Sequence, residues 1–116
     1  MRLLFVTHLY PPDHTAGVEV FASTTARLLA EAGHEVSVFT TEKDIARADL
    51  SVHRRSHGGI EVVEVVNNLF ARRFEETWRR PEVDTIFAAL LDEVRPDVVH
   101  VHHLLYLSAG ILDVCA

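Results

Sequence analysis

The residues best suited to chemistry in this sequence are the histidines of the segment His100-Val101-His102-His103. Side chains alternate along a β-strand, so His100 and His102 would lie on the same face. A zinc site needs about three or four protein ligands with supporting hydrogen bonds, and no cysteine or Glu-x-x-His set completes one here. We therefore expect no metal. We expect His102 to hydrogen-bond a sugar or phosphate, and His100, further back in the strand, to be a hydrogen-bonded core residue.

A second candidate is the segment Ala16-Gly17-Val18-Glu19, which opens a predicted helix. The start of a helix presents unpaired N–H groups and a partial positive charge, and both favour an anion. Gly17 has no Cβ, so a phosphate could approach the backbone closely there. The segment lacks the G-x-G-x-x-G pattern of dinucleotide-binding proteins. From spacing alone, two interpretations of Gly17 stay open: it admits a phosphate, or it only shapes the turn into the helix.

A third candidate combines arginine pairs with aromatic residues. If the stretch 69–80 were helical, its arginines and aromatics would form an amphipathic element that could lie on an anionic membrane. Two glutamates in the same stretch weaken that interpretation, and we favour a surface helix whose aromatics pack inward. The arginine pairs are Arg54-Arg55, Arg72-Arg73 and Arg79-Arg80, the aromatics are Phe70, Phe74 and Trp78, and the glutamates are Glu75 and Glu76.

Composition excludes several classes of protein. The net charge of -6 argues against nonspecific nucleic-acid binding, which needs a basic surface. The single cysteine, Cys115, cannot form an internal disulfide. No apolar stretch approaches the roughly 20 residues that span a bilayer, and the apolar run after Met1-Arg2 is too short for a signal peptide. We therefore expect a cytoplasmic protein and leave attachment to the inner face of the membrane open.

The pattern of apolar residues predicts alternating strands and helices. Buried strands are expected at 3–7, 36–40, 60–66 and 98–102. Helices with one apolar face are expected at 18–32 and 81–95, and a further helical segment is expected at 104–116. The polar stretch 41–59 is predicted to be a loop. Asp97 is expected to be a cap or turn residue after Pro96.

This alternation predicts an α/β fold with a Rossmann-like, doubly wound parallel sheet and helices on both faces. In the Rossmann order the fourth strand lies beside the first, on the opposite side from the second. Ligands bind such sheets at the carboxyl ends of the strands that flank this point. The order places His8 and the loop 9–17 opposite His102 and His103. We therefore include His8 and His103 among the candidate substrate- or phosphate-binding residues.

Several segments, taken in order, resemble the start of family-4 retaining glycosyltransferases. The resemblance covers the two ends of the chain well and the stretch 41–80 poorly. The matching segments read Met1-Arg2-Leu3-Leu4-Phe5-Val6-Thr7, Tyr10-Pro11-Pro12, Ala16-Gly17-Val18-Glu19, Ala32-Gly33-His34-Glu35-Val36 and Arg95-Pro96-Asp97-Val98-Val99-His100-Val101-His102.

The resemblance implies a GT-B fold, in which an N-terminal domain holds the acceptor and a C-terminal domain with a Glu-x7-Glu motif holds the nucleotide sugar. It implies transfer of a sugar, as in a hexosyltransferase, with retention of anomeric configuration and without a divalent metal or other cofactor. It places His102 near the transferred sugar as the catalytic candidate. Gly17 would lie against a phosphate, although Ala16 replaces the first glycine of the usual pair. Glu19 would contact sugar or acceptor hydroxyls, unless it is only a first-turn acid favoured by the helix dipole.

On this basis we expect residues 1–116 to be the truncated acceptor-side domain, without the donor-binding domain and inactive in isolation. Its partners would be a nucleotide-sugar donor and a sugar, lipid or small-molecule acceptor, and the sheet edge beside 98–102 could support self-association. An alternative is a non-catalytic Rossmann-like module that binds a phosphorylated ligand or a partner subunit. A nicotinamide-dependent oxidoreductase is disfavoured, because the glycine fingerprint is missing and Glu42 is the only candidate ribose ligand after the second strand.

Overall fold

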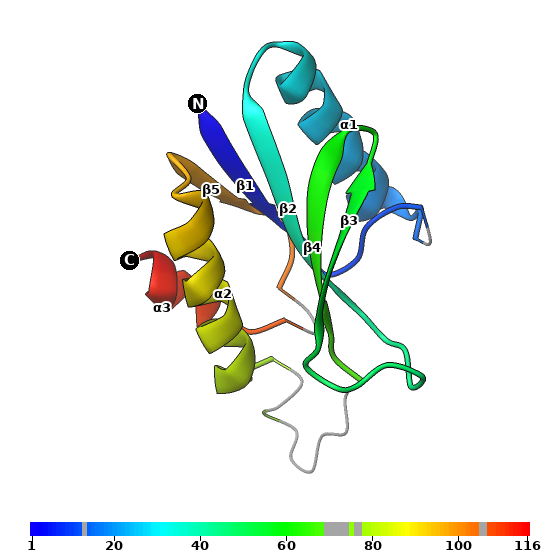
Figure 1. Cartoon of the computed structure of the whole chain (residues 1–116), viewed down its shortest axis with the longest axis vertical. Coiled ribbons are helices and arrows are strands. Elements are labelled where there is room, and N and C mark those ends of the chain that lie inside the picture. The colour runs from blue at the N-terminus through cyan, green and yellow to red at the C-terminus, as the bar shows by residue number, and fades with distance from the viewer. Residues whose placement is uncertain (13, 69–74, 76–77, 105–106) are drawn as a thin grey trace.

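The computed structural model describes residues 1–12, 14–68, 75, 78–104 and 107–116 (Figure 1). The helices and strands follow one another as the apolar pattern predicts, with one additional strand. In chain order they are β1 Arg2–Val6, α1 Gly17–Glu31, β2 Glu35–Glu42, β3 Val52–His57, β4 Ile60–Val66, α2 Pro81–Val94, β5 Val98–Val101 and α3 Ile111–Cys115.

The five strands form one sheet in the order β3-β4-β2-β1-β5. The pairs β4–β2, β2–β1 and β1–β5 are parallel, and β3 pairs with β4 in the antiparallel direction. The strand that follows α2 therefore lies directly beside the first strand, on the side away from β2, as the Rossmann order predicts. The carboxyl ends of β1 and β5 meet at the same edge of the sheet.

Helices cover both faces of the sheet, which confirms the doubly wound fold (Figure 1). Side chains alternate along each strand, so each strand contributes to two separate cores. Under α1, the core contains Leu3, Phe5, Val36, Val38 and Val62, together with Ala22 and Ala26 of the helix. Under α2 and α3, the core contains Leu4, Val6, Phe39, Val63, Val65, Phe87, Leu90 and Ile111.

The start of β5 is held against β1 by two hydrogen bonds between Arg2 and Asp97. The Arg2 backbone N–H donates to Asp97 Oδ2 at 2.8 Å. The Asp97 backbone N–H donates to the Arg2 carbonyl at 2.7 Å. These bonds fix the register in which Leu3 faces Val98. Asp97, which the sequence predicts to be a cap or turn residue, lies in a bend before β5, and its carboxylate bonds Arg2 of β1.

The prediction of a loop over 41–59 is wrong for residues 41 and 42, which belong to β2, and for residues 52–57, which form the edge strand β3. The alternating exposure of its side chains is typical of a strand with one covered face. Its composition hid it, because histidines, arginines and a serine occupy most of its positions. The better signal was Gly58-Gly59, where both residues have positive φ, of 59° and 80°. Two such residues between strands form a tight hairpin turn.

The predicted helix over 104–116 is also too long, because the helix α3 begins only at Ile111. Residues 105 and 106 lie outside the described part of the chain. Most of the stretch 69–80, including Phe70, Phe74 and the pair Arg72-Arg73, lies outside it as well. Its described end at 78–80 is not helical, and Trp78 is 42% exposed. The inward packing expected of these aromatics therefore does not hold for Trp78.

Candidate functional site

The site predicted from the sequence lies where β1 and β5 end side by side. The Val6 carbonyl, at the end of β1, accepts hydrogen bonds from the backbone N–H groups of His102 at 2.7 Å and His103 at 3.4 Å. This one acceptor brings the end of the histidine-bearing strand to the start of the loop that contains His8. The predicted convergence of the two segments is therefore present in the structure.

Three of the predicted binding residues meet at this edge: His8, Glu19 and His103. The rings of His8 and His103 lie with their centroids 4.2 Å apart. His8 Nε2 is 3.8 Å from Glu19 Oε1, and both side chains are largely buried. Burial lowers the pKa of His8, the nearby His103 and His14 lower it further, and the Glu19 carboxylate opposes these effects.

Glu19 lies in the first turn of α1, and its side chain is buried. Such an acid normally lies in solvent, whereas Glu19 is only 3% exposed. Its Oε2 atom is buried and has no hydrogen-bond partner among the described residues. An unpaired buried polar atom costs about 1–3 kcal/mol, so it usually marks a place for a ligand or a water molecule.

His102 projects from the end of β5 into a group of aromatic rings. Its ring stacks on His100 with centroids 4.1 Å apart and also contacts Phe5 and, from α1, Phe21. Its Nε2 atom is buried and has no hydrogen-bond partner within the described chain. Burial lowers the pKa of His102, and the neighbouring His100 lowers it further. At neutral pH the ring is therefore neutral, with one nitrogen that donates and one that accepts.

His100 is not the core residue that we predicted from its position in the strand. It is exposed, because β5 is the edge strand of the sheet and α1 lies over the neighbouring strands. Its ring meets Phe5 edge-on, with centroids 5.3 Å apart, and stacks on His102. Among the described residues, no group of three or more His, Cys, Asp or Glu side chains could hold a metal ion.

The start of α1 has the features of an open anion site. Ala16 precedes the helix and, within the described chain, provides no side-chain cap. Apart from its two chain neighbours and the backbone of its own helix, Gly17 has no described atom within 4 Å of the place where a Cβ would be, and its φ lies outside the left-handed region. The turn therefore does not require glycine at this position. The open space in front of Gly17 fits the other interpretation, close approach of a ligand.

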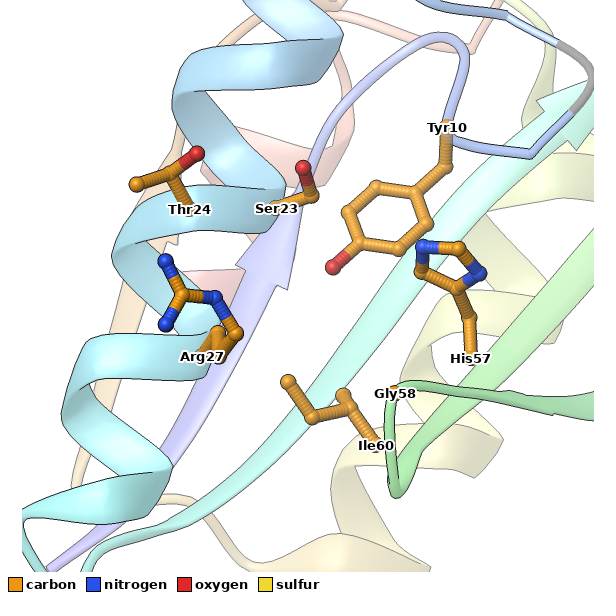
Figure 2. A pocket seen from close by; sticks show the side chains of 7 residues that line it. All are labelled: Tyr10, Ser23, Thr24, Arg27, His57, Gly58 and Ile60. Carbon is orange, nitrogen blue, oxygen red and sulfur yellow. The ribbon is translucent and has the colours of Figure 1, made fainter.

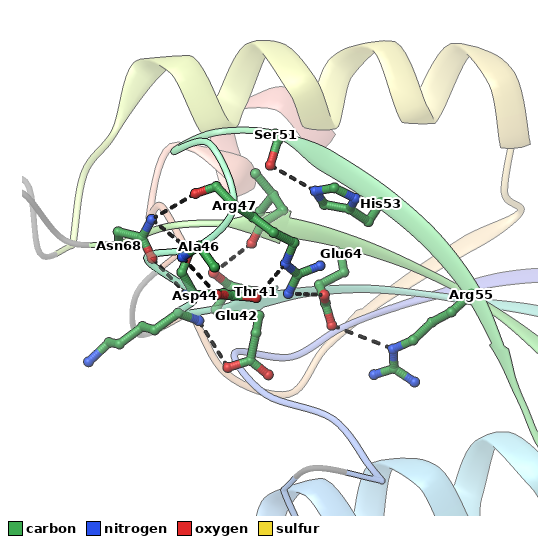
Figure 3. A network of polar contacts seen from close by, with 12 residues as sticks. Thr41, Glu42, Asp44, Ala46, Arg47, Ser51, His53, Arg55, Glu64 and Asn68 are labelled. Carbon is green, nitrogen blue, oxygen red and sulfur yellow. Dashed lines mark hydrogen bonds and ion pairs between the residues drawn. The ribbon is translucent and has the colours of Figure 1, made fainter.

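A polar network that sequence reasoning missed lies beside this edge and holds the β2–β3 connection (Figure 3). At its centre, the buried Glu64 pairs with Arg47 at 3.0 Å and with Arg55 at 3.5 Å. Arg47 also bonds Asp44 at 2.9 Å. Once β3 is recognised, the hairpin register pairs Glu64 with His53 and places Arg55 two residues further along β3, diagonally across from Glu64 on the same face of the sheet. The carboxylates of Asp44 and Glu64 are paired with arginines, whereas Arg55 Nη1 is buried without a hydrogen-bond partner among the described residues. We assign the network a structural role because it ties the β2–β3 connection to β4.

The described arginines of the three pairs also bind carboxylates. Arg54 bonds Glu61 and Glu93, Arg79 lies 3.6 Å from Asp113, and Arg80 bonds Asp49 at 2.7 Å. No helix within the described residues is long and apolar enough to cross a membrane. Peripheral membrane contact stays a prediction.

Comparison with known proteins identifies a family for nearly the whole chain. The family model described as Glycosyltransferase Family 4 matches residues 15–116. A curated relative, an uncharacterized 42.6 kDa protein in the cps region of Klebsiella pneumoniae, is 24% identical over 125 aligned positions. The match covers 96% of this chain and 32% of the relative, so the chain spans about a third of that protein.

Two solved structures share the fold. Sucrose-phosphate synthase from Thermosynechococcus elongatus superposes with a TM-score of 0.62 at 16% identity, over 86% of this chain and 26% of that one. Trehalose-6-phosphate synthase from E. coli, bound with UDP-2-fluoro glucose, superposes with a TM-score of 0.50 at 15% identity, over 87% of this chain and 27% of that one. Both are GT-B glycosyltransferases.

The lowered pKa values of His8 and His102 predict a loss of stability in mild acid. In the unfolded chain both rings take up a proton near about pH 6.5, but in the folded chain they do so only at lower pH. Between the pKa values of the folded and unfolded states, the unfolded chain therefore binds more protons. The free energy of unfolding falls as the pH drops below about 6.5. Thermal unfolding between about pH 7.5 and 5.5 measures this slope. His8→Asn and His102→Gln should each flatten it, and an unchanged slope in both variants would contradict the assignment.

Proposed function

The chain belongs to glycosyltransferase family 4, and on that premise we propose that it is the acceptor-side domain of a sugar transferase. The enzyme would move a sugar, of hexose type, from a nucleotide-sugar donor to an acceptor hydroxyl with retention of anomeric configuration. The observation that supports this most directly is the pairing of β1 with β5. It gathers His102, Glu19 and the open start of α1 at one edge of the sheet.

His102 is the residue that we propose to contact the transferred sugar. A neutral imidazole can donate to or accept from a sugar hydroxyl, whereas a charged imidazolium can only donate. The aromatic rings of Phe5 and Phe21 hold the imidazole in place. A hydrogen bond from a ring fixed in this way accelerates the reaction if it is stronger in the transition state than in the bound substrate.

The start of α1 is the group that we propose to meet the negative charge of the donor diphosphate as it departs. Backbone N–H groups at a helix start are fixed in direction and need no reorganisation during the reaction. The open space before Gly17 would let a phosphate oxygen come close to them. We propose that these groups, without a divalent metal or another cofactor, supply this domain's share of the stabilisation. The methyl group of Ala16 would reduce the space through which a phosphate approaches the backbone at that position.

Glu19, His8 and His103 form the proposed contact surface for the acceptor. The buried Glu19 Oε2 accepts hydrogen bonds, so it suits a hydroxyl group. The adjacent His8 and His103 rings extend the polar edge. A sugar, a lipid headgroup or a small polyol carries such hydroxyls.

The donor-binding half would come from a second domain, since the chain matches about a quarter to a third of the proteins it resembles. We propose that this second domain closes over the carboxyl edge of the sheet and that the complete enzyme works in the cytoplasm, with or without contact to the inner face of the membrane. The edge of β5 is the surface that self-association would use.

A transfer assay with radiolabelled UDP- and GDP-hexoses tests this proposal. We expect the polypeptide encoded by the complete reading frame to transfer or hydrolyse one of these donors and the 116-residue chain alone to do neither. In the complete polypeptide, His102→Ala should lower kcat/KM by about tenfold or more, because a hydrogen bond between neutral groups contributes about 0.5–1.5 kcal/mol.

His34→Ala is the matched control, because His34 lies at the opposite edge of the sheet, where its backbone N–H bonds the end of α1. It should leave kcat/KM unchanged. Robust transfer by the isolated chain would refute the proposal that a second domain is needed to bind the donor. Full activity of His102→Ala would refute the role of that residue.

Gly17→Ala separates the role of the helix start from a structural role of glycine. Its φ is ordinary and the space is open, so the variant should unfold at the same temperature as the wild type or slightly higher. Transfer should nevertheless fall about tenfold or more, because the methyl group occupies the space that a phosphate oxygen would use. An equally stable and equally active variant would exclude close approach of a phosphate at this position.

A further inference from the structure

A small cavity of about 100 Å³ lies on the α1 face of the sheet, at a distance from the site described above (Figure 2). Three segments enclose it: the loop after β1, the middle of α1 and the β3–β4 hairpin. Its lining residues are Tyr10, Ser23, Thr24, Arg27, His57, Gly58 and Ile60.

The cavity lies on the other side of α1 from His102. Phe21 projects from the helix toward β5, where it contacts His102. Arg27 projects toward the hairpin of β3 and β4, which lies at the other end of the strand order from β5. The transferase proposal does not use this cavity, so an inference about it stands or falls separately.

Tyr10 is the residue that makes the cavity unusual. Its side chain is 1% exposed, and its hydroxyl is buried without a hydrogen-bond partner among the described residues. Figure 2 shows the hydroxyl directed into the cavity, between Arg27 and Ile60. The ring is held from one side by His57, which meets it edge-on with centroids 5.9 Å apart. A buried tyrosine normally hydrogen-bonds through its hydroxyl, so this hydroxyl is available to a molecule in the cavity.

The groups around the hydroxyl determine what that occupant can be. Burial raises the pKa of Tyr10, with the charge of Arg55 opposing this effect, so the phenol stays protonated and can donate. Arg27 pairs through Nη1 with Glu31 at 3.1 Å, and the other N–H groups of its guanidinium can still donate. Ser23 donates its hydroxyl proton to the Val20 carbonyl at 3.2 Å, so in the cavity its Oγ can only accept, and the donors come from Tyr10 and Arg27. The cavity therefore favours an acceptor-rich, negatively charged ligand.

The volume of the cavity and the positions of its donors further limit which ligands could bind. A water molecule's share of liquid volume is about 30 Å³, so the cavity holds about three waters or one tetrahedral oxyanion. The donors reach it from two separate elements, the loop that contains Tyr10 and the helix that contains Arg27. Arginine with a hydroxyl donor is a common pair for phosphate recognition.

We propose that this cavity is a binding site for a single phosphate group, held by the Tyr10 hydroxyl and the Arg27 guanidinium. The group belongs either to free phosphate or to a phosphate monoester whose remainder projects into solvent. Tyr10 lies two residues after His8 and seven before Gly17, in the loop that leads into α1. A phosphate bound here would restrain the loop that leads into the helix start of the transferase site.

An NMR titration of the ¹⁵N-labelled chain with inorganic phosphate, at constant ionic strength, tests this inference. We expect saturable shifts of the Tyr10 and Gly58 amides and of the Arg27 side-chain N–H. Tyr10→Phe and Arg27→Gln should each weaken binding about tenfold or more, since each removes a hydrogen bond to a charged group. The removed hydroxyl has no protein partner, so Tyr10→Phe should keep the native spectrum.

The matched control is Arg2→Gln. Arg2 and Arg27 have the same side-chain exposure of 55%, and each pairs with a glutamate, at 3.2 Å and 3.1 Å. The control should bind phosphate like the wild type. Glucose 6-phosphate in a second titration distinguishes the sources: tighter binding than phosphate indicates a monoester, and equal binding indicates free phosphate. The absence of saturable shifts at Tyr10 and Gly58, or an equal loss of affinity in Arg2→Gln, would overturn the proposal.

Discussion

The parallel pairing of β1 with β5 is the interaction on which the rest of the structure depends. Local sequence cannot impose it, because about ninety residues separate the two strands and the helix α2 intervenes. Two bonds between Arg2 and Asp97 anchor one end of the pair, and the Val6 carbonyl anchors the other end. Between these anchors, the apolar side chains of the two strands pack into the two cores, one on each face of the sheet. The polar residues that follow each strand are thereby brought to one edge.

The energetics differ between the body of the sheet and this edge. In the body, apolar side chains are buried on both faces, and such burial contributes about 25 cal/mol for each Å² removed from water. At the edge, Glu19 Oε2 and His102 Nε2 are buried without a partner in the described chain, each at a cost of about 1–3 kcal/mol. These two atoms lie together at the carboxyl ends of β1 and β5, where a ligand could pair with both, whereas the buried Glu64 nearby is already paired with two arginines.

Much of this organisation could be predicted from the sequence. The strands of the parallel sheet are continuous apolar runs, and α2 has an unbroken apolar stripe. These patterns predicted the order of the elements along the chain and the placement of β2 and β5 on either side of β1. Sequence reasoning failed where the position of a strand at the edge of the sheet determines which residues it carries and how exposed they are. β3 is polar because it is an edge strand, and His100 is exposed because β5 is also an edge strand. The burial of Glu19 and the unpaired hydroxyl of Tyr10 depend on how residues 8–12 pack against α1 and the sheet, which no local sequence pattern encodes.

The most direct test of the account is a nuclear Overhauser experiment on the side chains at the ends of β1 and β5. The ring protons of His102 should show cross-peaks to Phe5 and Phe21, and those of His8 should show cross-peaks to His103. These contacts are the convergence on which the proposed sugar site depends. Cross-peaks from β1 to β2 alone, with none between the His8 and His103 rings, would contradict it.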